Sequence, residues 1–308
     1  MSNSQLSEMI CSELEQRGYK ASIVPVTHLA DLKKEIAGRH NDGAFEEVFY
    51  QERLTRFDYA LPAQLPDARS LIITAAPQPQ QRVEFKLKGK PYHFTVPPTY
   101  SSDTDRTVES ALSVILQPEG FSLHPARVPE KLLAVCSGLA LYGKNNIAYV
   151  EGMGSFHRLE AFFSDLPALE DTWVGLQAME QCHKCTACIS RCPTGAIVSD
   201  RFPILAERCL TFHNERSAEF PQWIDPSWHN CLIGCMACQL ACPVNKRFFN
   251  WFEEGVSFTG EETALLLGGI PRGQLPRTVA EKLQRLGLLE DVELVARNLT
   301  VLLRQRSA

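Results

Sequence analysis

The sequence lacks the segments that direct a chain to or across a membrane. Its first residues, MSNSQLSEMICSELEQRG, contain no basic region followed by an apolar stretch, so we do not expect a secretory signal. There is no twin-arginine pair near the start and no apolar run of membrane-spanning length. The opening segment instead predicts an amphipathic helix with Leu6, Met9, Ile10 and Leu14 on one face. These absences predict a cytoplasmic protein with no membrane partner.

The usual phosphate-binding motifs are also missing. No GxGxxG follows a predicted strand, and no GxxxxGKS occurs. The net charge of −5 and the pI near 5.9 give no global electrostatic reason to bind a polyanion. The stretch from Arg82 to Lys90 carries four positive residues, but a solvated hairpin accounts for it as well as a binding patch does.

Cysteine is abundant by contrast, and most of it falls into two matching runs. The chain has eleven cysteines, and the runs read Cys182-x2-Cys185-x2-Cys188-x3-Cys192-Pro193 and Cys235-x2-Cys238-x3-Cys242-Pro243. Thiolates at these spacings on a tight loop converge on one iron–sulfur cubane, and the following proline turns the chain away. The two runs therefore predict two 4Fe-4S clusters.

The fourth cysteine of each run in two-cluster ferredoxins crosses over to the other cluster. This rule assigns the first cluster to Cys182, Cys185, Cys188 and Cys242. It assigns the second to Cys192, Cys235, Cys238 and one further thiolate.

Two cysteines near the second run compete for that last position, Cys209 and Cys231. We favour Cys209, because the three residues between Cys231 and Cys235 do not fit the usual gap of two. Zinc sites and disulfides are the alternatives to clusters. Zinc prefers two separated CxxC pairs, and disulfide frameworks belong to secreted chains.

The remaining sequence predicts an α/β N-terminal domain over residues 1–175, with a mixed sheet and flanking helices. A bacterial-type two-cluster ferredoxin domain follows over 176–250, and a short helical tail over 251–308. Predicted strands are Ala21–Val26, Ser70–Ala75, Asn146–Val150 and Leu159–Phe163, with a hairpin at Glu84–Val96 that turns at Lys88-Gly89. Predicted helices are Thr107–Leu116, capped at Thr104 or Asp105, and Val128–Cys136, with Glu261–Leu267, Arg277–Leu286 and Asp291–Arg304 in the tail.

A bare ferredoxin does not need such a domain, which usually holds whatever receives the electrons. The densest loop chemistry in it is SGLALYGKNN at residues 137–146, followed by EGMGS at 151–155. Glycines such as Gly138 and Gly143 let backbone N–H groups approach a large ligand closely. Simple turns between strands explain the same composition.

Several segments together resemble the epoxyqueuosine reductase family. They are SGLALYGKNN, GMGSF, RCPTGAI, AERCLTFHNE and GCMACQLACPVN, with RFD at residues 56–58 and LPDARSLI at 65–72 upstream. The resemblance implies a corrinoid such as cobalamin in the α/β domain, beside two 4Fe-4S clusters. Reduced cobalt would then act on epoxyqueuosine in the anticodon loop of tRNA. No DxHxxG segment supplies a histidine below cobalt, which agrees with the family.

The resemblance also implies roles for individual residues. It suggests cofactor contacts at Arg56, Gly138, Gly143, Lys144 and Asn145. It favours Cys209 as the last cluster ligand, because AERCLTFHNE resembles a family segment that carries one.

The chain departs from the family pattern at two places. His124 occupies the position of a family carboxylate that is regarded as the proton donor. A histidine, with an ordinary pKa near 6.5, can deliver a proton at neutral pH, although a loop histidine before Pro125 is the plain alternative. The family typically continues into a longer helical region that helps to hold tRNA, whereas this sequence stops at Ala308. We therefore expect a small-molecule electron acceptor, or another corrinoid protein, nearly as much as tRNA.

The leading hypothesis is therefore an iron–sulfur and corrinoid-dependent reductase that takes electrons from a low-potential donor such as a ferredoxin or a flavodoxin. The alternative is an electron-transfer or reductive-activation protein that holds clusters without a corrinoid and acts on a protein partner. A relative of the reductive dehalogenases is a third possibility, and the missing twin-arginine signal argues against its exported type.

Overall fold

The computed structural model describes residues 3–100 and 102–307, and these form two compact units. Unit 1 contains the chain up to Pro77, Thr104–Thr186 and Ser199–Ile204, and unit 2 contains Gln78–Asp103, Ala187–Val198 and the chain from Leu205 onward. Each unit thus takes segments from both halves of the chain. The predicted domains, by contrast, followed one another along the sequence with limits at 175 and 250.

Unit 1 is built on a four-stranded sheet. The strands are β1 (Lys20–Pro25), β2 (Ser70–Pro77), β5 (Leu123–Pro125) and β8 (His157–Ser164). Their order is β1–β2–β8–β5, and every neighbouring pair is antiparallel. The predicted strands at Ala21–Val26, Ser70–Ala75 and Leu159–Phe163 lie within or overlap these elements.

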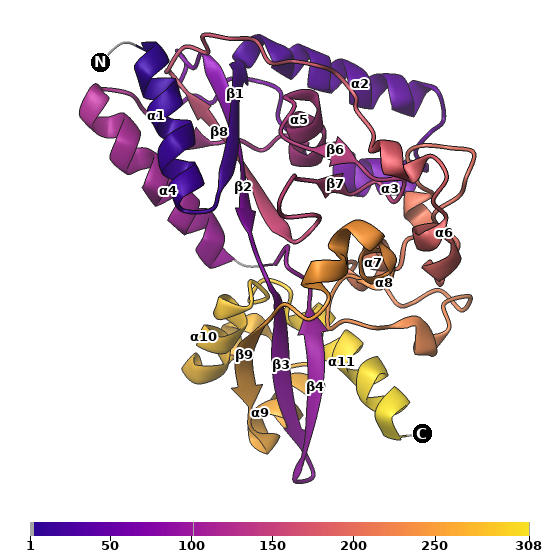
Figure 1. Cartoon of the computed structure of the whole chain (residues 1–308). Helices are drawn as coiled ribbons and strands as arrows, with labels where there is room; N and C mark the ends of the chain where they lie inside the picture. The colour runs from indigo at the N-terminus through magenta and orange to yellow at the C-terminus, as the bar shows by residue number, and fades with distance from the viewer. Residues whose placement is uncertain (1–2, 101, 308) are drawn as a thin grey trace. The chain divides into compact units, whose positions relative to one another are not determined.

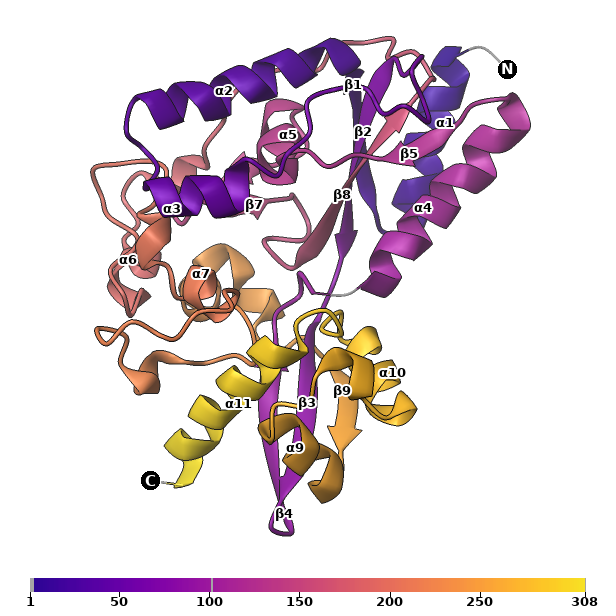
Figure 2. The same ribbon diagram turned by 180° about the vertical axis from the view of Figure 1, so that it is seen from behind.

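Helices cover both faces of this sheet (Figures 1 and 2). Their bounds are α1 (Asn3–Gln16), α2 (Leu29–Asn41), α4 (Ser102–Leu116) and α5 (Glu130–Cys136). Side chains alternate along β2, so Leu71 and Ile73 pack in the core with α2 and α5, whereas Ile72 packs with α1 and α4. The predicted apolar face of α1 is confirmed, because Leu6, Ile10 and Leu14 are buried in that second core.

Three short elements complete unit 1. They are α3 (Glu47–Phe49) and the paired strands β6 (Leu141–Tyr142) and β7 (Ala148–Tyr149). Of the strand predicted at Asn146–Val150, only the two residues of β7 form a strand in the structure. Helix α4 begins at Ser102, upstream of the predicted cap. Asp105 lies inside the helix and forms an ion pair with Arg158 of β8 instead of capping it.

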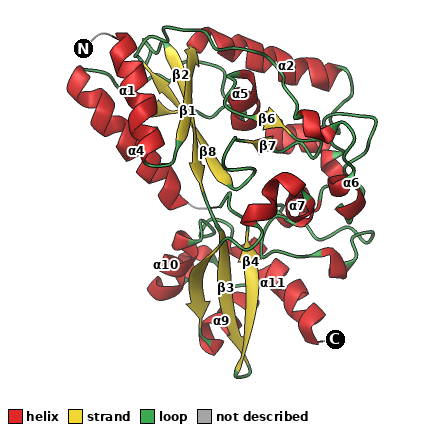
Figure 3. Ribbon diagram, viewed as in Figure 1, coloured by secondary structure: helices red, strands yellow, loops and turns green. Residues whose placement is uncertain are grey.

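Unit 2 contains a three-stranded sheet of order β4–β3–β9 (Figure 3). Its strands are β3 (Gln80–Leu87), β4 (Lys90–Val96) and β9 (Phe252–Phe258). β3 pairs antiparallel with β4 and parallel with β9. The mixed sheet was predicted for the N-terminal domain, where the four-stranded sheet is antiparallel throughout, so the mixed pairing lies in a different sheet from the predicted one. The predicted hairpin turn is confirmed, with φ of 48° at Lys88 and 75° at Gly89.

The helices of unit 2 are α6 (Ala187–Arg191), α7 (Leu210–Asn214), α8 (Ala237–Ala241), α9 (Gly260–Leu267), α10 (Arg277–Arg285) and α11 (Val292–Ser307). The last three match the predicted tail, but the tail also supplies β9, which the sequence did not predict. Phe258 of β9 stacks on Phe85 of β3, with ring centroids 4.8 Å apart, inside a core shared with α9, α10 and α11. The C-terminal segment is thus part of the core of unit 2.

None of the described helices is both long and apolar enough to span a membrane.

A bulge in the β3–β9 pairing depends on Gly255. The register shifts between Arg82 and Glu84, and a Cβ on Gly255 would lie 2.8 Å from the Arg82 carbonyl oxygen. Because that neighbour is backbone, it cannot move aside cheaply, and Gly255→Ala is expected to destabilise unit 2 by about 1–3 kcal/mol. The measurement is hydrogen exchange of the β3 and β9 amides. Gly273→Ala is the control, since no atom lies within 4 Å of its Cβ position. Equal protection in both variants would contradict this account of the bulge.

Candidate functional site

The cysteines of the two runs lie on matching pieces of backbone. In unit 2, α6 packs against α8, and each of these five-residue helices carries a cysteine at its second position, Cys188 and Cys238. A Cys-Pro pair follows each helix, at Cys192 and Cys242. The shared sequence pattern therefore corresponds to a shared local structure.

Three cysteines of unit 2 are electrostatic neighbours: Cys192, Cys209 and Cys235. The pKa of the Cys209 thiol is raised to about 11, mainly by burial and in smaller part by the neighbouring Cys235 and Cys192. The backbone N–H and the hydroxyl of Thr211 donate to the Cys209 sulfur and lower its pKa. Cys209, from another part of the chain, thus lies beside the second run with its sulfur accepting hydrogen bonds.

Cys231, the competing candidate, is placed differently. It is 1% exposed, and its Sγ donates to Asn230 Oδ1 at 3.2 Å. Burial raises the pKa of the Cys231 thiol, and the neighbouring Cys235 raises it as well. The Met236 N–H lowers that pKa, so this sulfur also receives a backbone donor, as Cys209 does. The difference is that Cys231 Sγ faces the amide oxygen of Asn230, a contact that suits a thiol.

The C-terminal helix holds the segment that carries Cys209. Asn214, at the end of α7, donates through Nδ2 to the Gly234 carbonyl at 2.7 Å, next to Cys235. Asn298 of α11 is fully buried and donates to the carbonyls of Asn214 and Leu232, each at 3.0 Å. Arg297 Nη2 donates to the carbonyls of His213 and Asn214 at 2.9 and 3.3 Å. These contacts fix α7 to the loop of the second run.

Cys182 and Cys185 belong to unit 1, and the first run crosses into unit 2 after Thr186. Cys182 ends a short 3-10 turn (Glu180–Cys182), and the Cys185 N–H donates to the Cys182 carbonyl at 3.3 Å. Across residues 3–100 and 102–307, no three His, Cys, Asp or Glu side chains lie close enough together to hold a single metal ion.

The glycine-rich loop of unit 1 is tied to the segment that leads to these cysteines. The Val174 N–H donates to the Cys136 carbonyl at 2.8 Å, and Tyr142 exchanges backbone hydrogen bonds of 2.9 Å with Gln177 and Met179. Lys144 Nζ donates to the Cys185 carbonyl at 3.0 Å. Of the predicted cofactor residues, Lys144 is thus joined to the first cysteine pair.

Three other predicted residues of this loop have local roles. Gly138 has φ of 80° and ends α5, a common place for glycine. A Cβ on Gly143 would lie 2.6 Å from both Asn145 Oδ1 and Tyr149 Cε2, so only glycine fits there. Asn145 Nδ2 donates to the Tyr149 hydroxyl at 3.0 Å, whereas its buried Oδ1 has no partner within the described chain.

Arg56 and His124 are not joined to this loop. Arg56 is exposed and follows a π-helical turn at Tyr50–Leu54. His124 lies on β5, opposite Phe163 of β8, and is partly exposed. Neither side chain has a hydrogen-bond or ion-pair partner among the residues that the structure describes.

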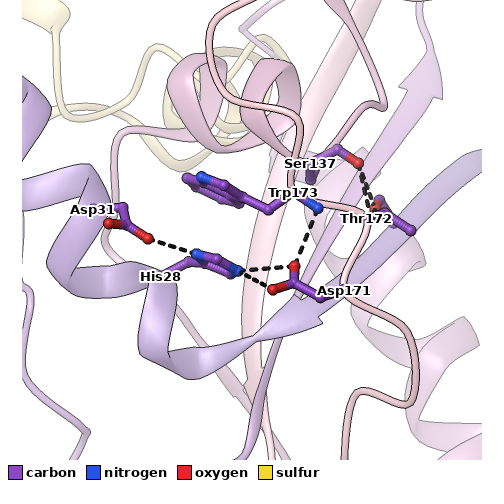
Figure 4. Close-up of polar contacts among 7 residues, drawn as sticks. His28, Asp31, Ser137, Asp171, Thr172 and Trp173 are labelled. Carbon is purple, nitrogen blue, oxygen red and sulfur yellow. Dashed lines mark hydrogen bonds and ion pairs between the residues drawn. The ribbon is translucent and has the colours of Figure 1, made fainter.

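A histidine clamp that the sequence analysis missed holds the same segment (Figure 4). His28 lies between two carboxylates, with Nδ1 2.6 Å from Asp31 and Nε2 2.9 Å from Asp171. Its ring stacks on Trp173 at 4.1 Å, and Asp171 accepts the Trp173 N–H at 3.1 Å. Thr172, which lies between Asp171 and Trp173, donates to the Ser137 carbonyl at 3.1 Å. The three-residue spacing of His28 and Asp31 at the start of α2 was the available sequence signal, but nothing in it pointed to Asp171.

Unit 1 also holds a partly buried cluster of carboxyl groups around one arginine. Arg158 Nε lies 2.8 Å from both Asp105 and Glu160, and Glu130 is nearby. Burial raises the pKa of Glu130 to about 7 and that of Glu160 to about 9. Burial therefore favours the protonated forms of Glu130 and Glu160.

The cysteine-rich part of the chain matches a known family. Residues 181–245 match the 4Fe-4S double cluster binding domain, and this stretch contains both runs as well as Cys209 and Cys231.

Curated relatives of the chain are epoxyqueuosine reductases. That of Pseudomonas aeruginosa is 30% identical over 194 residues, which cover 62% of this chain and 50% of the relative. That of Shewanella oneidensis is 36% identical over 122 residues, which cover 39% and 30%. The chain spans about a third to a half of the length of these relatives.

Solved structures extend the likeness over nearly the whole chain. An epoxyqueuosine reductase crystallised with an epoxyqueuosine-modified tRNA-Tyr stem loop has a TM-score of 0.72 at 20% identity, and the match covers 98% of this chain and 82% of that one. The enzyme of Streptococcus thermophilus has a TM-score of 0.67 at 17% identity, with the same coverage. At these identities the likeness establishes the fold.

The chain is epoxyqueuosine reductase-like in its sequence over up to 62% of its length and in its fold over nearly all of it. The family resemblance found in the sequence is thereby confirmed. In this epoxyqueuosine reductase-like chain, the cysteine runs and the glycine-rich loop are the parts that the sequence singled out for function.

The histidine clamp predicts how the segment after Asp171 responds to a mutation. Asp171→Asn removes the charge that pairs with His28, and the amides of residues 172–179 are expected to exchange faster in hydrogen-exchange mass spectrometry. The hydrogen bond from His28 lowers the pKa of Asp171. The contribution of Asp171 to the stability of the folded chain is therefore fully present above the ordinary aspartate pKa of about 3.9. It is lost as the pH falls through the lower pKa that Asp171 has in the folded chain.

Glu170→Gln is the matched control, because it removes the same charge from the adjacent exposed residue. Similar exchange in both variants would show that general charge, and not the clamp, holds the segment.

Proposed function

We propose that this chain is an oxidoreductase that holds two 4Fe-4S clusters and, in its α/β part, a corrinoid. The observation that carries the proposal is the placement of Cys192, Cys209 and Cys235 as neighbours beside the paired helices α6 and α8. When bound, the clusters would supply one-electron carriers and the corrinoid a cobalt centre that passes electrons to the substrate.

The ligands of the second cluster are Cys192, Cys209, Cys235 and Cys238 in this proposal. The donors from Thr211 to the Cys209 sulfur support it, because hydrogen bonds to sulfur favour the thiolate, which is the form that binds iron. The hydrogen bond from Cys231 to Asn230 supports leaving Cys231 as a free thiol.

The ligands of the first cluster are Cys182, Cys185, Cys188 and Cys242. Spacing and the crossing of the fourth cysteine carry this assignment. Lys144 supports the loop between Cys182 and Cys185 by holding the Cys185 carbonyl.

The corrinoid site would include the loop from Gly138 to Asn145. The buried Oδ1 of Asn145 supports it, because this acceptor has no donor within the described chain and a corrin ring carries amide side chains. Arg56 is exposed and has no hydrogen-bond or ion-pair partner among the described residues, so it is available to a ligand. The local structure alone explains why Gly138 and Gly143 are glycines, so these two residues do not support the corrinoid site.

His124 would act as the proton donor. Its side chain is partly exposed on the edge strand β5, and no partner in the described chain competes for its proton. A donor in this position needs both access and an unengaged nitrogen.

The substrate that we propose to test first is epoxyqueuosine in tRNA. The names of the curated relatives and the stem loop bound in a related structure support this choice. The electrons would come from a low-potential protein such as a ferredoxin or a flavodoxin.

Metal content tests the proposal directly. Protein purified without oxygen from cobalamin-fed cells is expected to contain about eight irons, about eight sulfides and one cobalt per chain. Eight irons without cobalt would favour an electron-transfer protein that acts on a protein partner. A chain without iron would contradict the proposal as a whole.

The same measurement decides the last cluster ligand. Cys209→Ala is expected to lose about four irons, whereas Cys231→Ala keeps about eight. The opposite result would reassign the ligand to Cys231.

The role of His124 is tested by turnover. His124→Ala is expected to keep its iron and cobalt but to reduce epoxyqueuosine in tRNA about a hundredfold more slowly, the usual size of a lost proton donor. His93→Ala removes an exposed histidine of β4 and serves as the control. Unchanged turnover in His124→Ala would remove this residue from the mechanism.

A further inference from the structure

Asn230 contacts the sulfur of a proposed cluster ligand. Its Nδ2 lies 3.2 Å from Cys235 Sγ and 3.0 Å from the Trp228 carbonyl oxygen. Its Oδ1 accepts the Met236 N–H at 2.9 Å and the Cys231 thiol at 3.2 Å. One exposed amide side chain therefore joins four groups around the start of the second run.

These partners fix the orientation of the amide. The Met236 N–H can only donate, so the atom that faces it must be the oxygen. The Trp228 carbonyl can only accept, so the atom that faces it must be the nitrogen. The group directed at Cys235 Sγ is thus an N–H donor, and a flipped amide would break contacts on both sides.

We propose that Asn230 is a positioning residue that raises the reduction potential of the cluster bound by Cys235. This inference rests on the proposed clusters. Reduction adds negative charge to a cluster and its thiolates, and a donor to a ligand sulfur stabilises that added charge. The cluster becomes easier to reduce as a result.

The first run has a different residue at the position that corresponds to Asn230. Cys185 corresponds to Cys235, and the residue five positions before it is Glu180, where the second run has Asn230. A glutamate side chain carries no N–H, and Glu180 is exposed. Two runs with the same cysteine spacing therefore differ in a contact that sets cluster potential.

The two ends of the Asn230 amide have separable roles. The Oδ1 end holds the loop through Met236, and an aspartate preserves that acceptor. The Nδ2 end reaches the sulfur, and both aspartate and leucine remove it. Asn230→Asp therefore tests the donor with the loop contact kept, and Asn230→Leu tests it without adding charge.

The experiment is a redox titration of the full chain, loaded with its clusters and followed by electron paramagnetic resonance. In both variants one cluster is expected to become about tenfold harder to reduce, which is about 59 mV for a one-electron couple. The iron content is expected to stay at the level of the unmodified chain. Cys231→Ala leaves the contact between Asn230 and Cys235 in place and is expected to leave the potential unchanged.

The cluster that shifts must be the one that Cys209→Ala removes. Unchanged potentials in a fully loaded chain would overturn this inference alone, and so would a shift in Asn230→Asp without one in Asn230→Leu, since charge then suffices. Loss of the cluster in both variants would assign Asn230 to assembly and overturn the tuning role. An unmodified chain without iron would overturn the proposed function, and this inference with it.

Discussion

The packing of α6 against α8 is the contact on which the cluster-binding part of unit 2 depends. Each helix has five residues, far too few to be stable alone, so each persists only because the other and the adjoining loops hold it. The cysteines on these helices and after them therefore keep their spacing through tertiary contacts. Iron bound by those sulfurs would also hold α6 and α8 together. The stability of this part of the fold should therefore depend on whether the clusters are bound.

The second run has one cysteine fewer than the first, so its proposed cluster needs a ligand from another part of the chain. The position that corresponds to Cys182 is Leu232, which is fully buried and contributes no sulfur. In the proposed second cluster Cys209 would make up the loss, and the helix α7 that follows it is held by α11 through Asn298 and Arg297. The C-terminal helix thus serves the candidate site as well as the core of unit 2. This explains why a segment that the sequence marked only as a tail is so extensively hydrogen-bonded to the cysteine region.

Local signals in the sequence were sufficient for some elements and insufficient for others. The periodicity of α1 and the turn at Lys88-Gly89 each lie within a few residues, and both predictions are confirmed. Strand β9 escaped prediction because FEEGVSF has adjacent charges and a glycine, and its partner β3 lies some 170 residues upstream. The clamp is non-local in the same way, since His28 and Asp171 are 143 residues apart. The cysteine spacing identified the candidate ligands, but not the Asn230 side chain that contacts one of them.

Lys144 makes a contact within the fold at a position that the resemblance assigned to the cofactor. The resemblance suggested a cofactor contact, yet its ammonium group holds the Cys185 carbonyl. Together with the backbone bonds from Val174, Gln177 and Met179, this contact makes the glycine-rich loop and the first cysteine pair one connected piece of unit 1. It also brings a positive charge close to thiolates that would carry negative charge when metal is bound. A ligand bound at the loop would therefore be linked to the first cysteine pair through hydrogen bonds that the fold already contains.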